Sequence, residues 1–209
     1  MNDLLAKDQT MVDAIVGAAL DVLDDELDWR ACWRVKWEAL HEAARRVWST
    51  PLTNGQREAE IRALLHWCDS RERLPIVLPV LASNAVGHRL FWRMFAELWV
   101  MSDDAEHPEI LQLLRKRRPP PPLPTLPSGI FTIYRGCTAE HVFGLSWTLS
   151  RAVAEQFAAD HHGRMPYSVV AEAQCTCAAV FLRLADRDEG ELLVDPAHIK
   201  IRAVDPLDV

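Results

Sequence analysis

The stretch Gly144-Leu-Ser-Trp-Thr-Leu-Ser-Arg-Ala-Val-Ala-Glu-Gln-Phe-Ala158 joins a strand pattern directly to a helix pattern. Its first five residues predict a short strand, and 150–160 are helix formers with apolar residues on one face. Successive side chains of a strand point to opposite faces, so Ser146 and Thr148 share one face. Trp147 then points the other way, toward the core of the domain.

Short strand patterns surround this stretch on both sides. They alternate apolar and polar residues or are rich in β-branched residues, and they cover 130–135, 168–173, 178–184, 191–194 and 198–204. Many short strands with one good helix predict a compact, mixed β domain of about 80 residues, which we place at 129–209.

A proline-rich segment precedes this domain. Six of the nine residues from Pro119 to Pro127 are proline, which favours extended polyproline geometry, so 119–128 is predicted to be a stiff linker. A ligand for an SH3-type domain is the alternative. The basic residues 115–118 just before it are interpreted as complementing the carbonyl end of a helix dipole.

Residues 1–118 have helical patterns throughout. Apolar residues recur at steps of three and four in 11–23, 29–48, 53–67 and 83–101, and a shorter helix is expected after Pro108. Seven of the eight tryptophans lie here, and we expect them to fill the core of a helical bundle, with a binding surface as the alternative. The predicted fold class is therefore α+β, with an all-helical region preceding the β domain.

Composition limits the kind of partner and compartment. The formal net charge of −7 argues against a broad basic surface for nucleic acid, although a local patch stays open. Five irregularly spaced cysteines predict free, mostly buried thiols in a reducing compartment. Residues 1–10 lack a secretory pattern and no stretch is apolar enough to span a bilayer, so we expect a cytoplasmic protein without membrane contact. Delivery as an effector remains an alternative.

Three segments occur in the order of a known family. They are Tyr134-Arg135-Gly136, the strand-to-helix stretch 144–158, and Glu189-Gly190-Glu191-Leu-Leu-Val-Asp-Pro196. Together they resemble the arginine–serine–glutamate class of mono-ADP-ribosyltransferases, with its Ser-Thr-Ser strand and Glu-x-Glu motif. The resemblance covers about 130–204 and implies an ADP-ribosyltransferase-like fold for that region.

The resemblance implies NAD+ as a substrate and assigns two catalytic carboxylates. Cleavage of the nicotinamide–ribose bond develops positive charge on the ribose, and Glu191 would stabilise that charge. Glu189 would face the acceptor and is associated in the family with arginine as the target, because a carboxylate can orient and deprotonate a guanidinium.

The remaining implied positions bind the dinucleotide. Arg135 would hold its pyrophosphate, since a guanidinium matches phosphate oxygens well. Gly136 would let the backbone approach the nicotinamide amide, and Tyr167 would stack on the nicotinamide ring. Ser146 would bond the ribose or orient Glu191, with Thr148 at the third position of the Ser-Thr-Ser pattern. A register shifted by two residues, using Thr148 and Ser150, is the alternative.

Several functions fit these residues. The leading hypothesis is transfer of ADP-ribose to a protein side chain, with NAD+ glycohydrolase activity, transfer to nucleic acid and an inactive transferase-like binding module as alternatives. The helical region would then bind a target or an inhibitor protein, and by analogy with the family the chain would be a toxin or phage effector. No metal site is expected, because the adjacent His161 and His162 have no cluster of partner ligands.

Overall fold

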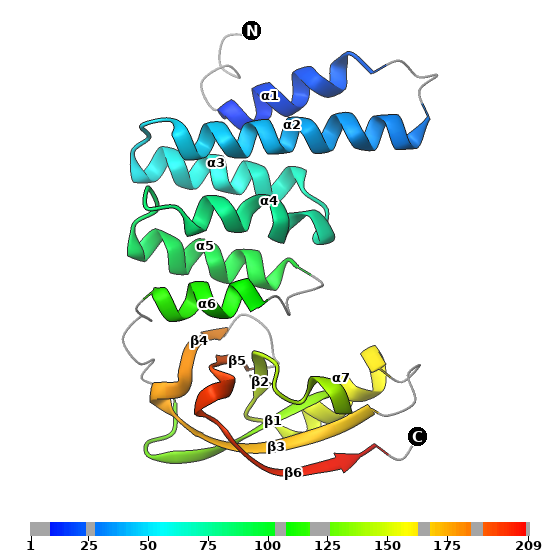
Figure 1. Cartoon of the computed structure of the whole chain (residues 1–209), viewed down its shortest axis with the longest axis vertical. Coiled ribbons are helices and arrows are strands. Elements are labelled where there is room, and N and C mark those ends of the chain that lie inside the picture. Colours follow the sequence, from blue (N-terminus) through cyan, green and yellow to red (C-terminus); the bar gives the residue numbers. More distant parts are fainter. Residues whose placement is uncertain are drawn as a thin grey trace, which may run out of the picture. The chain divides into compact units, whose positions relative to one another are not determined.

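The structure is a computed structural model of the whole chain (Figure 1). It describes residues 9–23, 28–102, 108–117, 126–162, 168–184 and 190–207, with the backbone alone for 160–162. The chain divides into two compact units, Met1–Ala105 and Glu106–Val209. We call them the helical unit and the sheet unit and describe each by itself.

The helical unit is a stack of five described helices that follow one another in chain order (Figure 1). Each helix contacts the next one and the next but one in the chain. The carboxylate of Glu60 in α3 accepts the backbone N–H groups of Met11 and Val12, which ties down the start of α1. The helices are α1 (Met11–Asp21), α2 (Trp29–Ser49), α3 (Asn54–Trp67), α4 (Ser70–Ala82) and α5 (His88–Val100).

Helix α4 was not expected from the sequence. It contains Pro75 and Pro79, and each proline in a helix interior costs about 3 kcal/mol. The helix forms because it buries five aliphatic side chains, each worth about 1.5–3 kcal/mol. These are Leu74, Ile76, Val77, Val80 and Leu81. The expected helix over 83–101 accordingly begins later, at His88.

The tryptophans do not all lie in the core. The prediction is confirmed for α5, where Trp92 and Trp99 are buried, but it is wrong for α2, where Trp29, Trp33 and Trp48 are exposed. The buried residues of α2 all lie between positions 39 and 47. With 21 residues, α2 is longer than α1, α3 and α4, which have 11, 14 and 13. Its first two turns, which hold Trp29 and Trp33, therefore extend beyond the helices that would cover them. Trp48 lies in the last turn, at the other end of the helix.

The sheet unit contains one six-stranded sheet with the order β4-β5-β2-β1-β3-β6. Every neighbouring pair is antiparallel, and β1 and β3 pair along nine residues, so the sheet is more regular than the expected mixed arrangement of short strands. All six strands and the helix predicted for this region are present. The elements are α6 (Pro108–Lys116), β1 (Ile130–Thr138), β2 (Ser146–Thr148), α7 (Arg151–His162), β3 (Ser168–Thr176), β4 (Val180–Leu184), β5 (Glu191–Val194) and β6 (Lys200–Pro206).

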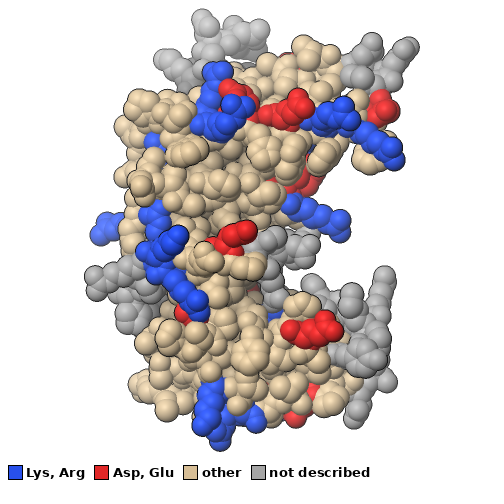
Figure 2. All heavy atoms as spheres, in the orientation of Figure 1, with Lys and Arg blue, Asp and Glu red and all other residues tan. Residues whose placement is uncertain are grey.

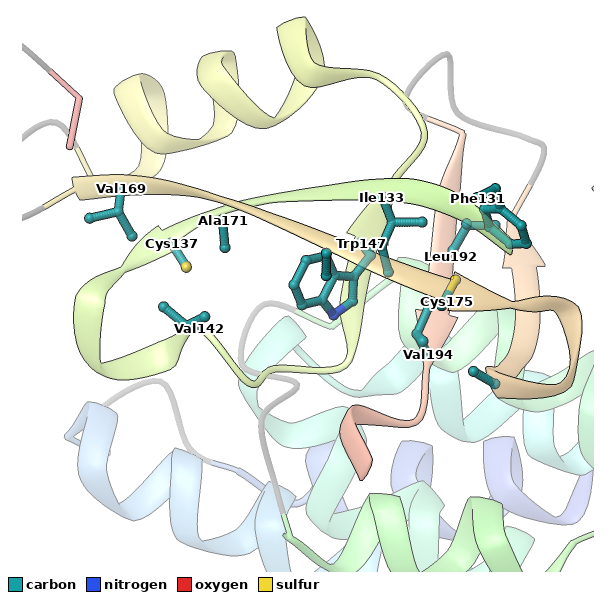
Figure 3. Close-up of a cluster of buried hydrophobic side chains, with 12 residues drawn as sticks. Phe131, Ile133, Cys137, Val142, Trp147, Val169, Ala171, Cys175, Leu192 and Val194 are labelled. Atoms are coloured by element: carbon teal, nitrogen blue, oxygen red, sulfur yellow. The ribbon is translucent and has the colours of Figure 1, made fainter. Parts of the chain in front are cut away.

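The sheet packs on both faces. One face carries the main hydrophobic cluster, with Trp147, Ile133 and Leu192 fully buried in it (Figure 3). The other face is covered by α7, whose Ala154 and Ala158 pack against the strands (Figure 3). The expectation that Trp147 points into the core is confirmed, and its indole N–H donates to the backbone oxygen of Gly144 at 2.8 Å.

Helix α6 belongs to the sheet unit, whereas the sequence placed it in the helical region 1–118. Its Arg115 makes two hydrogen bonds to the buried carboxylate of Asp195, from Nε at 2.9 Å and from a terminal nitrogen at 2.7 Å. Arg115 thus has a specific partner instead of only complementing a helix dipole. Most of the proline-rich linker, residues 119–125, lies outside the described residues.

The Arg115–Asp195 ion pair is expected to make the stability of the sheet unit depend on acid pH. Its hydrogen bonds hold the pKa of Asp195 below its ordinary value. The stabilisation is therefore present above the unfolded-state pKa of about 3.9 and is lost as pH falls through the lower folded-state value. In calorimetry, Arg115→Met should lower the melting temperature at pH 7, and the difference from wild type should shrink toward pH 3. A difference that stayed constant down to pH 3 would rule out a charge-based contribution.

All five cysteines are free thiols and three are buried, as expected, and burial raises the pKa of Cys175 to about 11. At the top of Figure 2, over α1 and α2, basic and acidic side chains are interspersed, and on α2 Glu42 pairs with Arg45 and Arg46. No helix in the described ranges is long and apolar enough to cross a membrane.

Candidate functional site

Ser146 and Glu191 meet across two neighbouring strands. β2 pairs antiparallel with β5, with Ser146 opposite Leu193 and Thr148 opposite Glu191. The Ser146 hydroxyl donates a hydrogen bond to Oε1 of Glu191 at 2.6 Å. This short, charge-assisted bond fixes the carboxylate, although the two residues are 45 positions apart in the sequence.

The backbone before Glu191 helps to aim this carboxylate. Gly190 has φ of 54°, a left-handed conformation that L side chains rarely adopt. The chain therefore turns sharply at Gly190 and enters β5 with Glu191 as its first residue. The positive φ therefore explains why the residue between the two glutamates of the Glu-x-Glu motif is glycine.

Arg135 joins the loop 139–145 to strand β2. Its Nε donates to the backbone oxygen of His141 at 3.0 Å, and one terminal nitrogen donates to the backbone oxygen of Ser146 at 2.7 Å. Burial lowers the pKa of Arg135 from its ordinary value, while Cys137 and Glu191 favour its charged form. Since arginine stays protonated in proteins, the site contains a fixed cation beside the Ser146–Glu191 pair.

Gly136 has a packing role that the sequence did not predict. A Cβ built at this position would lie 2.0 Å from the backbone oxygen of Ala154 and 2.7 Å from the backbone nitrogen of Ala158. The space beside its Cα is therefore filled by α7, and only the backbone groups of Gly136 are left for contact with a ligand.

The two possible registers of the serine motif have different geometries. Ser146 contacts Glu191, whereas Ser150 lies at the start of α7, where its hydroxyl accepts the backbone N–H of Val153 at 3.4 Å. The Thr148 hydroxyl is buried and accepts the backbone N–H of Ser150 at 3.1 Å. Ser146 is therefore the serine beside the carboxylate, and Thr148 supports the turn from β2 into α7.

Two of the seven predicted site residues, Glu189 and Tyr167, lie outside the described residues. The sequence also missed His141, which contributes its backbone oxygen to Arg135 and whose ring nitrogen Nδ1 lies 2.6 Å from the hydroxyl of Thr138. No side-chain pattern could have revealed it, because a backbone carbonyl is present at every residue. Among the described residues, no group of three His, Cys, Asp or Glu side chains could hold a metal ion.

Arg135→Lys is expected to loosen the loop 139–145. A lysine ammonium lacks the planar fork that reaches the carbonyls of His141 and Ser146 at the same time. Backbone amide exchange at Gly144, whose N–H donates to the His141 oxygen, should accelerate by about 10-fold, corresponding to one lost hydrogen bond. Hydrogen exchange measured by NMR checks this, with Leu64 in α3 of the helical unit as an internal control. An unchanged rate at Gly144 would show that Arg135 does not hold the loop.

No known family model, curated protein or solved structure matches this chain.

Proposed function

We propose that the chain is an NAD+-dependent mono-ADP-ribosyltransferase, with the sheet unit as an ADP-ribosyltransferase-like catalytic domain. It transfers ADP-ribose to a protein side chain and releases nicotinamide. The observation that carries the proposal is the 2.6 Å hydrogen bond from Ser146 to Glu191, next to the Arg135 cation.

This arrangement suits cleavage of the bond between nicotinamide and C1 of the ribose. Nicotinamide leaves with the bonding electron pair, and positive charge spreads over C1 and the ring oxygen of the sugar. A carboxylate held rigidly near that centre, as Glu191 is by Ser146, stabilises the charge without having to reorganise. The guanidinium of Arg135 supplies positive charge and hydrogen-bond donors for the pyrophosphate of NAD+.

The acceptor completes the reaction at C1. A nucleophilic nitrogen or oxygen of the target forms a bond to C1 and loses its proton to a base or to solvent. If the target is arginine, Glu189 is the carboxylate proposed to orient the guanidinium and take that proton. Trp147, the middle residue of the serine motif, is buried in the hydrophobic cluster, and strand alternation places it on the opposite face of β2 from Ser146.

The proposal is tested by incubating the full chain with NAD+ labelled in its adenylate phosphate. Nicotinamide release and transfer of label are measured with and without cell lysate, before and after protease or nuclease treatment. Release with protease-sensitive label supports the transferase. Release without transferred label indicates a glycohydrolase, and nuclease-sensitive label indicates a nucleic acid acceptor. No release under any condition would overturn the proposal.

A further inference from the structure

The loop 139–145 between β1 and β2, which supplies a backbone oxygen to Arg135, carries an exposed aromatic side chain. Phe143 is 65% exposed, whereas its apolar neighbours Val142 and Leu145 are only 7% and 5% exposed. The loop therefore turns its other large apolar side chains inward and presents one phenyl ring to solvent.

Phe143 is close in the chain to two residues that Arg135 contacts. It lies between His141 and Ser146, and the backbone oxygens of both residues accept hydrogen bonds from Arg135. The same Ser146 holds Glu191 through its hydroxyl. The exposed ring thus belongs to a segment whose two ends are bonded to the cation of the site.

The backbone on both sides of Phe143 is held by further hydrogen bonds. Gly144 donates its N–H to the His141 oxygen at 3.3 Å and accepts the indole N–H of Trp147 at 2.8 Å. Leu145 accepts the backbone N–H of Val194 at 2.9 Å. A ring presented by such a braced loop loses little conformational entropy when it binds a ligand, which favours affinity.

We propose that Phe143 is a stacking platform for a flat aromatic heterocycle, one of the two bases of the dinucleotide bound by Arg135 and Glu191. The inference rests on the proposed function. A phenyl side chain has no hydrogen-bonding group, so what it offers a ligand is its apolar ring, and aromatic rings stack offset or edge-to-face. The adenine base and the positively charged nicotinamide ring both fit, the second with an added cation–π attraction.

Binding is measured by calorimetry in the Glu191→Gln background, which prevents turnover during the titration. Phe143→Ala should weaken NAD+ binding by about 5- to 150-fold, the effect of losing one base–aromatic stacking contact. Phe143→Trp should retain the affinity. Val204→Ala removes another partly exposed apolar side chain, from β6, and should leave binding unchanged.

Two fragments of the dinucleotide identify the stacked base. ADP-ribose contains adenine without nicotinamide, and nicotinamide mononucleotide contains nicotinamide without adenine. Weaker binding of only the first to Phe143→Ala assigns the adenine, and weaker binding of only the second assigns the nicotinamide ring.

Equal NAD+ affinity of Phe143→Ala and its parent would overturn the stacking proposal and leave the proposed function intact. If NAD+ affinity is equal but Phe143→Ala alone lowers transfer of the ADP-ribose label, Phe143 contacts the acceptor instead of NAD+. If the parent with Phe143 does not bind NAD+ and the wild type releases no nicotinamide, the proposed function fails, and the stacking role fails with it.

Discussion

Glu191→Gln is expected to slow nicotinamide release by roughly 100- to 1,000-fold, the usual effect of removing one preorganised group that stabilises transition-state charge. Glutamine has the shape of glutamate, and its amide oxygen can accept the hydrogen bond from Ser146 as Oε1 of Glu191 does. What it lacks is the negative charge that we propose stabilises the ribose cation. Melting temperature should therefore stay near the wild-type value while kcat falls, which is measured by nicotinamide release at saturating NAD+.

A matched variant separates this effect from a general change in charge. Glu155 lies in α7 of the same unit, is about half exposed, and pairs with Arg151 at 2.9 Å. Glu155→Gln removes the same charge at a place where a surface ion pair contributes little, so its release rate should equal that of wild type. Full activity in Glu191→Gln would exclude Glu191 as the charge-stabilising carboxylate, whatever Glu155→Gln does.

The strands of the sheet unit were predictable because their signal is local. Alternating and β-branched residues mark each of the six strands, and the turn into α7 follows directly on the strand 146–148. The structure extends the strand expected at 130–135 to Thr138, because β1 pairs with β3 as far as Ser168. Strand ends depend on the partner strand, and the sequence of one strand does not contain that information.

The failures in the helical unit have a non-local origin. Pro75 and Pro79 argue against a helix by local propensity, and burial of the apolar residues around them outweighs that preference. Trp29 and Trp33 have the spacing of residues on the buried face of a helix. They are nevertheless exposed, because the start of α2 extends beyond the neighbouring helices. In both cases the outcome depends on the lengths and positions of other helices.

The candidate site was predictable in its residue types and only partly in its contacts. Arg135, Ser146 and Glu191 were identified through a family resemblance, and the strand order that brings the serine to the carboxylate depends on the whole sheet. The hydrogen bonds from Arg135 to two backbone carbonyls could not be predicted from the pattern of side chains, because every residue has a backbone carbonyl. The packing role of Gly136 likewise becomes visible only once α7 is placed over β1.

Gly136→Ala is expected to destabilise the sheet unit by about 3 kcal/mol or more, at or above the upper end of the usual cost of overpacking a core. The added methyl group would lie 2.0 Å from the backbone oxygen of Ala154. The obstacle is helix backbone, so no side-chain rotation can relieve the clash, and α7 has to move away from the sheet. That movement uncovers Val170, which is packed against Ala154 and Ala158. Chemical denaturation of the full chain measures the loss.

Gly17→Ala is the matched control, because it adds the same methyl group where nothing lies within 4 Å. Gly17 is inside α1, where alanine is a better helix former, so this variant should stabilise the helical unit by about 1 kcal/mol. The two glycine substitutions thus have opposite expected signs. If Gly136→Ala were as stable as wild type, α7 would not pack against β1 as closely as the structure has it. The turn from β2 into α7, which follows Thr148, would then need a different explanation.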